Sequence, residues 1–197
     1  MKTNKIFKRL TYISLSTILL STSILADDIT DTIEDALTSY KKGDYVQAKE
    51  DLNYAIELLK QKKGETIKGF LPDALDGWKA EEAKSESAGS GMLGGGSTTS
   101  RTYTKDKSKI VISVVTDSPL LQGLGSLIGN PMFNSGGKLK RINREKASIK
   151  YNAKQKSGDI TIMLDKRFLV TVEGTKVTED ELVEYAKAID FKKIKEQ

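Results

Sequence analysis

The sequence of 197 residues contains no cysteine and no histidine. Without cysteine the chain forms no disulfide and carries no lipid on a cysteine side chain, so a packed core must supply its stability. The lack of imidazole and thiol groups also removes the usual general base, the usual thiol nucleophile and the usual zinc ligands. We therefore assign no catalytic, metal-binding or cofactor-binding residue and expect no cofactor.

The N-terminus has the three parts of a secretory signal peptide. Four basic residues begin it, namely Lys2, Lys5, Lys8 and Arg9. An apolar run diluted by Ser and Thr then extends to Leu25, and the small residue Ala26 precedes Asp27. The run is too short and too polar for a membrane-spanning helix, which needs about 20 strongly apolar residues. We expect cleavage after Ala26, export to the periplasm, and no lipoprotein anchor.

The positive charge of the chain belongs largely to this leading segment. The sequence has 32 basic and 27 acidic residues, a net charge of +5, and the four basic residues of the signal are matched by no acidic one. The exported part is therefore nearly neutral. Its composition gives no support to nucleic-acid binding.

Residues 29–62 have the apolar spacing of two antiparallel helices. The first helix is expected to place Ile29, Ile33, Ala36, Leu37 and Tyr40 on one face. The second is expected to do the same with Tyr45, Ala48, Leu52, Ala55, Ile56 and Leu59. Between them Gly43 can end a helix in a left-handed conformation and Asp44 can cap the next one, and Gly64 is expected to mark the end of the second helix.

This stretch resembles a single tetratricopeptide repeat. The matching residues are Tyr40, Gly43, Asp44, Tyr45, Ala48, Leu52, Ala55 and Leu58. In that family the glycine lies at the turn between two helices, and the small alanines let the helices approach closely. Because arrays usually need about three repeats to bury a continuous core, we expect a lone helical hairpin, residues 27–66, that packs on the rest of the chain.

Residues 67–191 predict a second, α+β part made of an antiparallel sheet with packed helices. Phe70 to Trp78 is an apolar segment whose only Trp we expect in the core. Strands are expected near 98–104, 109–116, 138–143, 147–154, 159–165 and 168–173. Thr178 and Glu181 form a capping box that opens a helix with Leu182 and Tyr185 on its buried face. The residues from 192 to 197 are expected to form a loose charged tail.

Two segments are candidate contact surfaces. The stretch 118–137 has no charged residue and is expected to be core, a lid over an apolar pocket, or a contact with a membrane or partner. Its apolar residues are Leu120, Leu121, Leu124, Leu127, Ile128 and Phe133. A basic hairpin is a candidate site for an anionic partner, or alternatively a solvated sheet edge that discourages aggregation. Its cations are Lys138, Lys140, Arg141, Arg144 and Lys146.

Gly89 to Gly94 matches the glycine spacing of a dinucleotide-binding loop, but strand-like residues follow it where that site needs a helix. We interpret it as a hairpin loop. The chain from Asp27 onward is also similar to an uncharacterised group of exported proteobacterial proteins, through residues 71–78, 117–120 and 170–174. That resemblance implies an envelope location and no catalytic residue.

The sequence thus favours an exported, non-catalytic binding or interaction protein of the bacterial envelope, with an unknown protein or apolar or anionic ligand as its partner and peripheral membrane contact as one form of that role. One alternative is a protein that binds anionic lipid or polymer through the basic hairpin. Another is a hydrolase of unfamiliar type that uses Ser, Lys or carboxylate groups.

Overall fold

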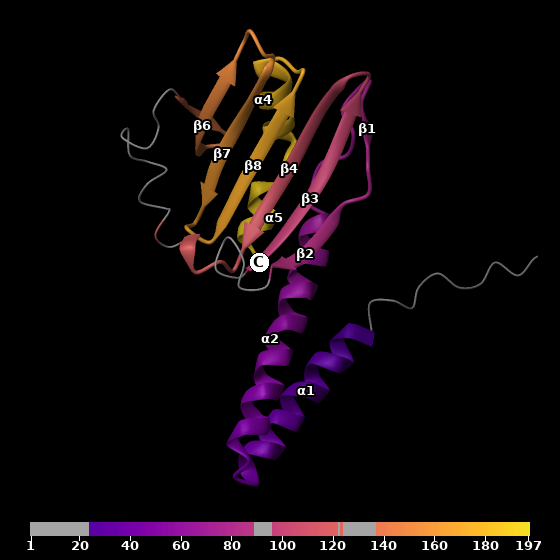
Figure 1. Ribbon diagram of the computed structural model, residues 1–197, viewed down its shortest axis with the longest axis vertical. Helices are drawn as coiled ribbons and strands as arrows, with labels where there is room; N and C mark the ends of the chain where they lie inside the picture. Colours follow the sequence, from indigo (N-terminus) through magenta and orange to yellow (C-terminus); the bar gives the residue numbers. More distant parts are fainter. Residues whose placement is uncertain (1–23, 89–95, 122, 124–136) are drawn as a thin grey trace, which may run out of the picture.

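The computed structural model describes residues 24–88, 96–121, 123 and 137–197 (Figure 1). Helices α1 (Ile24–Lys41) and α2 (Tyr45–Lys68) come first, and α4 (Glu179–Ala188) and α5 (Phe191–Lys195) come last. The strands between them are β1 (Lys79–Ala80), β2 (Lys84–Ala88), β3 (Gly96–Lys105), β4 (Ser108–Thr116), β5 (Lys138–Ile142), β6 (Glu145–Asn152), β7 (Ser157–Leu164) and β8 (Phe168–Thr175). The α+β class and the N-terminal helical hairpin agree with the sequence prediction.

The eight strands form one antiparallel sheet in the order β1-β3-β4-β8-β7-β6-β5, and β2 also pairs with β3. The β3–β4 hairpin and the β5–β8 meander are joined where β4 lies beside β8, with Ile112 opposite Val172 and Val114 opposite Val170. Apolar side chains alternate along these strands, so one face of the sheet is buried. The predicted strands are confirmed.

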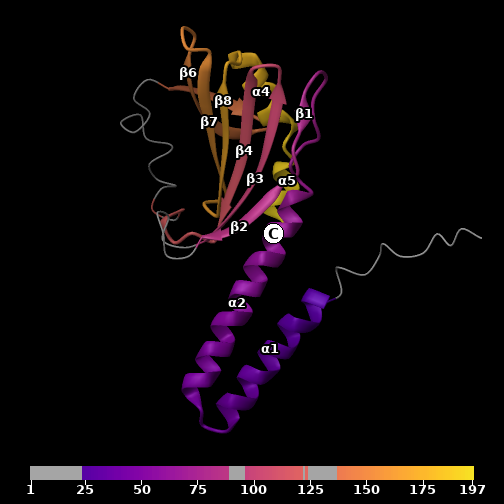
Figure 2. The same ribbon diagram turned by 45° about the vertical axis from the view of Figure 1, so that its right-hand side comes forward.

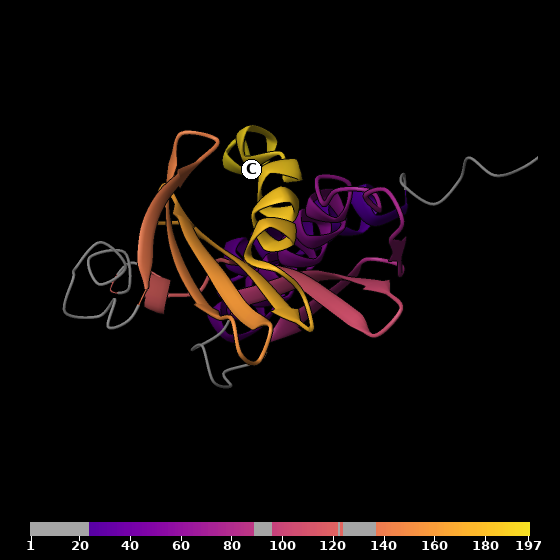
Figure 3. The same cartoon turned by 90° about the horizontal axis from the view of Figure 1, so that it is seen from above.

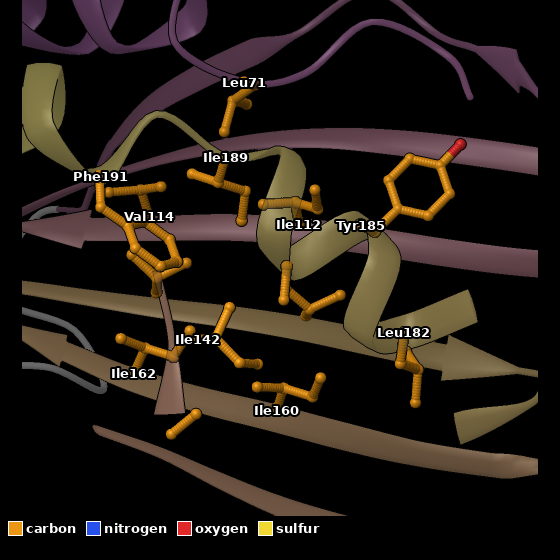
Figure 4. Close-up of a cluster of buried hydrophobic side chains, with 14 of the residues drawn as sticks. Leu71, Ile112, Val114, Ile142, Ile160, Ile162, Leu182, Tyr185, Ile189 and Phe191 are labelled. Carbon is orange, nitrogen blue, oxygen red and sulfur yellow. The ribbon is translucent and has the colours of Figure 1, made fainter. Parts of the chain in front are cut away.

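Helices α4 and α5 cover the buried face of the sheet, as Figure 3 shows from above. Their apolar side chains point at those of the central strands (Figure 4). The capping box is present: Glu181 N donates to Thr178 Oγ1 (3.2 Å), and Thr178 N donates to a Glu181 carboxylate oxygen (2.9 Å). The expectation of a loose tail is wrong, because Ile194 of α5 is fully buried in the same core.

The segment between α2 and β1 closes one side of this core. Trp78 is buried, with its ring 5.2 Å from that of Tyr185 and nearly perpendicular to it. The carbonyl oxygen of Pro72 accepts hydrogen bonds from Tyr103 Oη (2.7 Å) and from Arg101 Nη1 (3.0 Å). Burial raises the pKa of both tyrosines, so they stay uncharged. The prediction that Trp78 is a core residue is confirmed.

The helical hairpin projects beyond the end of the sheet (Figures 1 and 2). Only the last part of α2 packs on the sheet, against β2 and β3. The sequence suggested that Gly64 ends α2, but this prediction is wrong, because the helix runs through Gly64 to Lys68. Glycine allows a close approach of helix and strand there, because a Cβ would overlap the hydroxyl of Ser85 on β2.

Two features predicted from the sequence lie entirely outside the described residues. They are the leading segment before Ile24 and the glycine pattern at Gly89–Gly94.

Candidate interaction surface

Helices α1 and α2 meet along a narrow seam of small residues. Ala36 on α1 and Ala48 and Ala55 on α2 are buried, together with Ile29 and Leu58. Small side chains let two helix axes approach closely, but they leave the larger apolar residues of the hairpin without a place in the seam. The seam therefore uses only part of each predicted apolar face.

The larger apolar residues form a second stripe on each helix. They are Ile33, Leu37 and Tyr40 on α1 and Tyr45, Leu52, Ile56 and Leu59 on α2, all between 45% and 67% exposed. With 3.6 residues per turn, each stripe is rotated from its own seam in the same sense, by about 60° on α1 and about 80° on α2. Two antiparallel helices related by their local two-fold axis then present both stripes on the same side. We call these seven residues the apolar hairpin face.

The tip of the hairpin holds the two stripes together. The rings of Tyr40 and Tyr45 lie 5.7 Å apart across the turn. Gly43 takes the left-handed conformation, with φ of 82°, and the Asp44 carboxylate accepts from Gln47 N (3.1 Å), as the sequence predicted. This turn fixes the register of the two helices. It therefore also fixes the height of each residue of the face, meaning its distance from the turn along the hairpin axis.

The opposite side of the hairpin is polar. The same rotation places Asp28 and Asp35 of α1 and Gln47 and Gln61 of α2 there, all of them exposed. Tyr54 is the large apolar side chain on that side, and it is 60% exposed. The hairpin is thus amphipathic as a unit, although neither broad side rests on the sheet.

The sequence pattern identified these apolar residues but predicted that they lie on the packed faces of the two helices. The separation of alanines and most large apolar residues onto two stripes about 60–80° apart was the available signal. Nine of the eleven large hydrophobic residues most exposed in the described chain lie on the hairpin or its turn, and the other two are Leu120 and Leu139.

The basic hairpin, which the sequence predicted as a site for an anionic partner, has part of its positive charge neutralised within the fold. Lys140 Nζ and Lys138 Nζ lie 2.9 Å and 3.3 Å from the carboxylate oxygens of Glu179. Hydrogen bonds from Lys140 and then Lys138 lower the pKa of Glu179, which keeps it charged. Arg141, Arg144 and Lys146 are exposed around the β5–β6 turn. The five cations therefore lie on the same hairpin, and Glu179 balances part of the charge of Lys138 and Lys140.

The predicted apolar contact segment is described only at its start. Leu121 is buried and Leu120 is 48% exposed. Leu124, Leu127, Ile128 and Phe133 lie outside the described residues.

A polar cluster joins the hairpin to the sheet. Lys63 Nζ on α2 donates to both carboxylate oxygens of Asp117, at 2.7 Å and 2.9 Å. Thr116 donates to Asp117 (2.8 Å) and lies 2.9 Å from the hydroxyl of Ser97. Burial alone would raise the pKa of Asp117, but the hydrogen bonds from Lys63 and Thr116 outweigh it and the pKa is lowered. The Lys63–Asp117 pair therefore links α2 to the end of β4.

The outer face of the sheet carries a groove of about 440 Å³. Its walls include Lys109, Asp159, Thr161, Thr171 and Glu173. Asp159 and Glu173 are direct cross-strand neighbours on β7 and β8. Within the described parts of the chain, no three His, Cys, Asp or Glu side chains gather as a metal site would need.

No protein-family model, curated protein or solved structure matches this chain. Of the helices in the described ranges, none combines the length and apolar character required to cross a bilayer. The apolar hairpin face therefore has to be interpreted from its own geometry.

Proposed function

We propose that the chain is an exported, non-catalytic interaction protein of the bacterial envelope, and that the apolar hairpin face binds a protein partner. The observation that carries this proposal is the contrast between the two parts of the molecule. The sheet buries residues such as Ile110 and Val172 completely, whereas residues of the same kind on the hairpin are half exposed. Contiguous exposed apolar patches mark interaction sites more often than they mark unused surface.

A protein partner fits this face better than a lipid surface does. Helix α1 carries five acidic residues, Asp27, Asp28, Asp31, Glu34 and Asp35, against the single basic residue Lys41. Amphipathic helices that lie on membranes usually carry Lys and Arg on their polar face, because anionic lipids attract these cations. The net negative charge of α1 would be repelled by such a surface.

The hairpin also has the rigidity that specific binding favours. Asp51 of α2 accepts hydrogen bonds from Ser39 of α1 (3.3 Å) and from Gln47 (2.7 Å). The last part of α2 is held on the sheet by the Lys63–Asp117 pair. A face fixed in advance loses little conformational entropy when its partner binds.

Site-specific photo-crosslinking in the producing cells tests the proposal. A photoreactive amino acid replaces Leu52 on the apolar hairpin face, and in a matched control it replaces Tyr54, which is on the opposite side and similarly exposed. We expect a defined crosslinked protein from position 52 and none from position 54. Equal patterns from both positions, or none from either, would contradict the proposed binding face.

The same cells test the envelope location. Fractionation should recover the chain in the periplasmic fraction, with a mass that corresponds to an N-terminus at Asp27. Recovery of the full-length chain from the cytosol would contradict export.

A further inference from the structure

We propose that the partner on the apolar hairpin face is a second copy of this chain, so that two hairpins form an antiparallel four-helix bundle. This inference rests on the proposed binding role of that face and names its occupant. It is carried by three properties of the hairpin: the height of its apolar residues, the charge of its two helices, and the size of the face.

The apolar residues lie at heights that suit self-association. Counted from the centre of the turn, Ile33 and Leu52 are equally far along their helices, as are Tyr40 and Tyr45. A two-fold axis parallel to the hairpin would bring two Ile33 and two Leu52 side chains into one layer, and two Tyr40 and two Tyr45 into the layer at the tip. Layers of large apolar side chains contributed by four helices are the core of a four-helix bundle.

The charges of the helices select one arrangement of the two copies. Helix α1 has the five acidic residues given above, whereas α2 has five lysines and four acidic residues. Placing α1 on the second copy's α1 would oppose two acidic helices. Placing α1 on the second copy's α2 avoids that repulsion, and it keeps every neighbouring pair of helices antiparallel, as the helix dipoles favour in either arrangement.

One ion pair is expected only in this arrangement. Glu34 and Lys49 lie at the outer edges of α1 and α2, on opposite sides of the hairpin and about two helix widths apart within one copy. Their positions along the helices differ by only two residues in distance from the turn, or about 3 Å. With α1 on the second copy's α2, Glu34 of each copy would lie close to Lys49 of the other.

The size of the face sets the expected strength of the dimer. From Tyr45 to Leu59 it is about 21 Å long at 1.5 Å per residue, and two helices make it about 20 Å wide. Two such faces would bury on the order of 1,000 Å² with their edges, near the lower end of specific interfaces. We therefore expect a reversible dimer that dissociates on dilution.

Sedimentation velocity of the processed chain, purified from the envelope over a range from micromolar to sub-millimolar concentration, tests this proposal. The expected result is a monomer–dimer equilibrium. Leu52→Glu should abolish the dimer, because it would place two glutamates in the apolar layer that Ile33 and Leu52 of the two copies form. Tyr54→Glu is the matched control and should leave the dissociation constant unchanged. Circular dichroism should show both variants folded, since both side chains are exposed in the monomer.

A charge exchange tests the arrangement of the helices. Glu34→Lys and Lys49→Glu should each weaken the dimer by roughly tenfold, because each dimer has two such pairs and like charges then face each other. The double variant Glu34→Lys with Lys49→Glu should restore the wild-type dissociation constant. A double variant as weak as the single ones would overturn the placement of α1 on the second copy's α2.

The outcomes separate this inference from the proposed function. A wild-type chain that remains monomeric at every concentration, yet crosslinks through position 52 to a different protein, would overturn the dimer and leave the interaction role in place. A monomeric chain that crosslinks to nothing would overturn both.

Discussion

Gly64 of α2 lies directly against Ser85 of β2, so that a Cβ on the glycine would overlap the serine hydroxyl. The hydroxyl of Thr99 is within hydrogen-bond distance of both partners, at 3.3 Å from the Gly64 carbonyl oxygen and 3.2 Å from Ser85 Oγ. The approach of helix to sheet at this point positions the projecting hairpin. A helix would ordinarily gain from alanine here, so the glycine runs against the helix preference of the position.

Gly64→Ala should therefore destabilise the protein. Helix propensity favours Ala over Gly by about 1 kcal/mol, but the added Cβ would displace the Ser85 hydroxyl from its hydrogen bond with Thr99 and would still lie 3.0 Å from Ser85 Cβ, which crowds the packing of the helix on the strand. We expect the free energy of unfolding, measured by urea denaturation, to fall by about 1 kcal/mol or more. Gly69→Ala is the control, because Gly69 has a φ of −70° and its Cβ would meet only ordinary contacts. If both variants are as stable as the wild type, the close packing at Gly64 is not as described.

The features that could be predicted from the sequence are those with local signals. The strands alternate apolar and polar residues with period two, and the Thr178–Glu181 box requires only four consecutive positions. The turn at Gly43 and Asp44 is likewise complete within a few residues. For Trp78 the prediction succeeded because one large aromatic in an apolar segment has few alternatives to burial.

The features that were missed depend on tertiary contacts. Gly64 resembles a helix end because the sequence does not show that β2 lies against it. Ile194 follows two lysines, and its burial depends on α5 turning back over the sheet. Periodicity found Leu37 and Leu52 but could not show which of two adjacent stripes makes the helix seam and which stays exposed. For the same reason the candidate binding face was not predicted.

The core and the hairpin face should respond differently to truncation. Trp78→Ala removes a buried ring that packs on Tyr185, and we expect it to lower the free energy of unfolding by about 3–5 kcal/mol. Leu52→Ala should change that quantity by only about 0.5 kcal/mol, because the side chain is half exposed.

Both free energies of unfolding should be measured at a protein concentration at which the chain is monomeric. At higher concentrations, weaker dimerisation of a variant would add to its apparent loss of stability. A large loss for Leu52→Ala under those conditions would indicate that the apolar hairpin face contacts the rest of its own chain.

The junction between α2 and the sheet should be sensitive to acid. The pKa of Asp117 is lower in the folded chain than in the unfolded chain, so its contribution to stability is fully present above the unfolded pKa. That contribution is lost as the pH falls through the folded pKa. Asp117→Asn should cost about 1 kcal/mol at neutral pH and should make the stability of the protein less dependent on pH below about 4.

Asp73→Asn is the control for this effect, because the Asp73 side chain is 99% exposed and lies 3.4 Å from Arg101. It should leave both the stability and its pH dependence unchanged. A curve for Asp117→Asn that is parallel to the wild-type curve at all pH values would contradict the role given to the Lys63–Asp117 pair.

The expected processing site lies inside the first turn of α1, which begins at Ile24 in the full chain. Cleavage after Ala26 would leave Asp27 and Asp28 at the new helix start, where acidic side chains interact favourably with the helix dipole. It would spare Ile29, a buried residue of the seam. Processing should therefore leave the hairpin intact.

Ala26→Tyr should block this cleavage, because the enzyme requires a small side chain before the cut. The chain recovered from the envelope should then keep its leading segment and be heavier by 26 residues, as intact-protein mass spectrometry would show. Asp28→Tyr, which places the same ring just beyond the cut, should be processed normally at Asp27. Normal processing of the Ala26→Tyr chain would place the cut elsewhere, and the helix that reaches the periplasm would then begin at another residue.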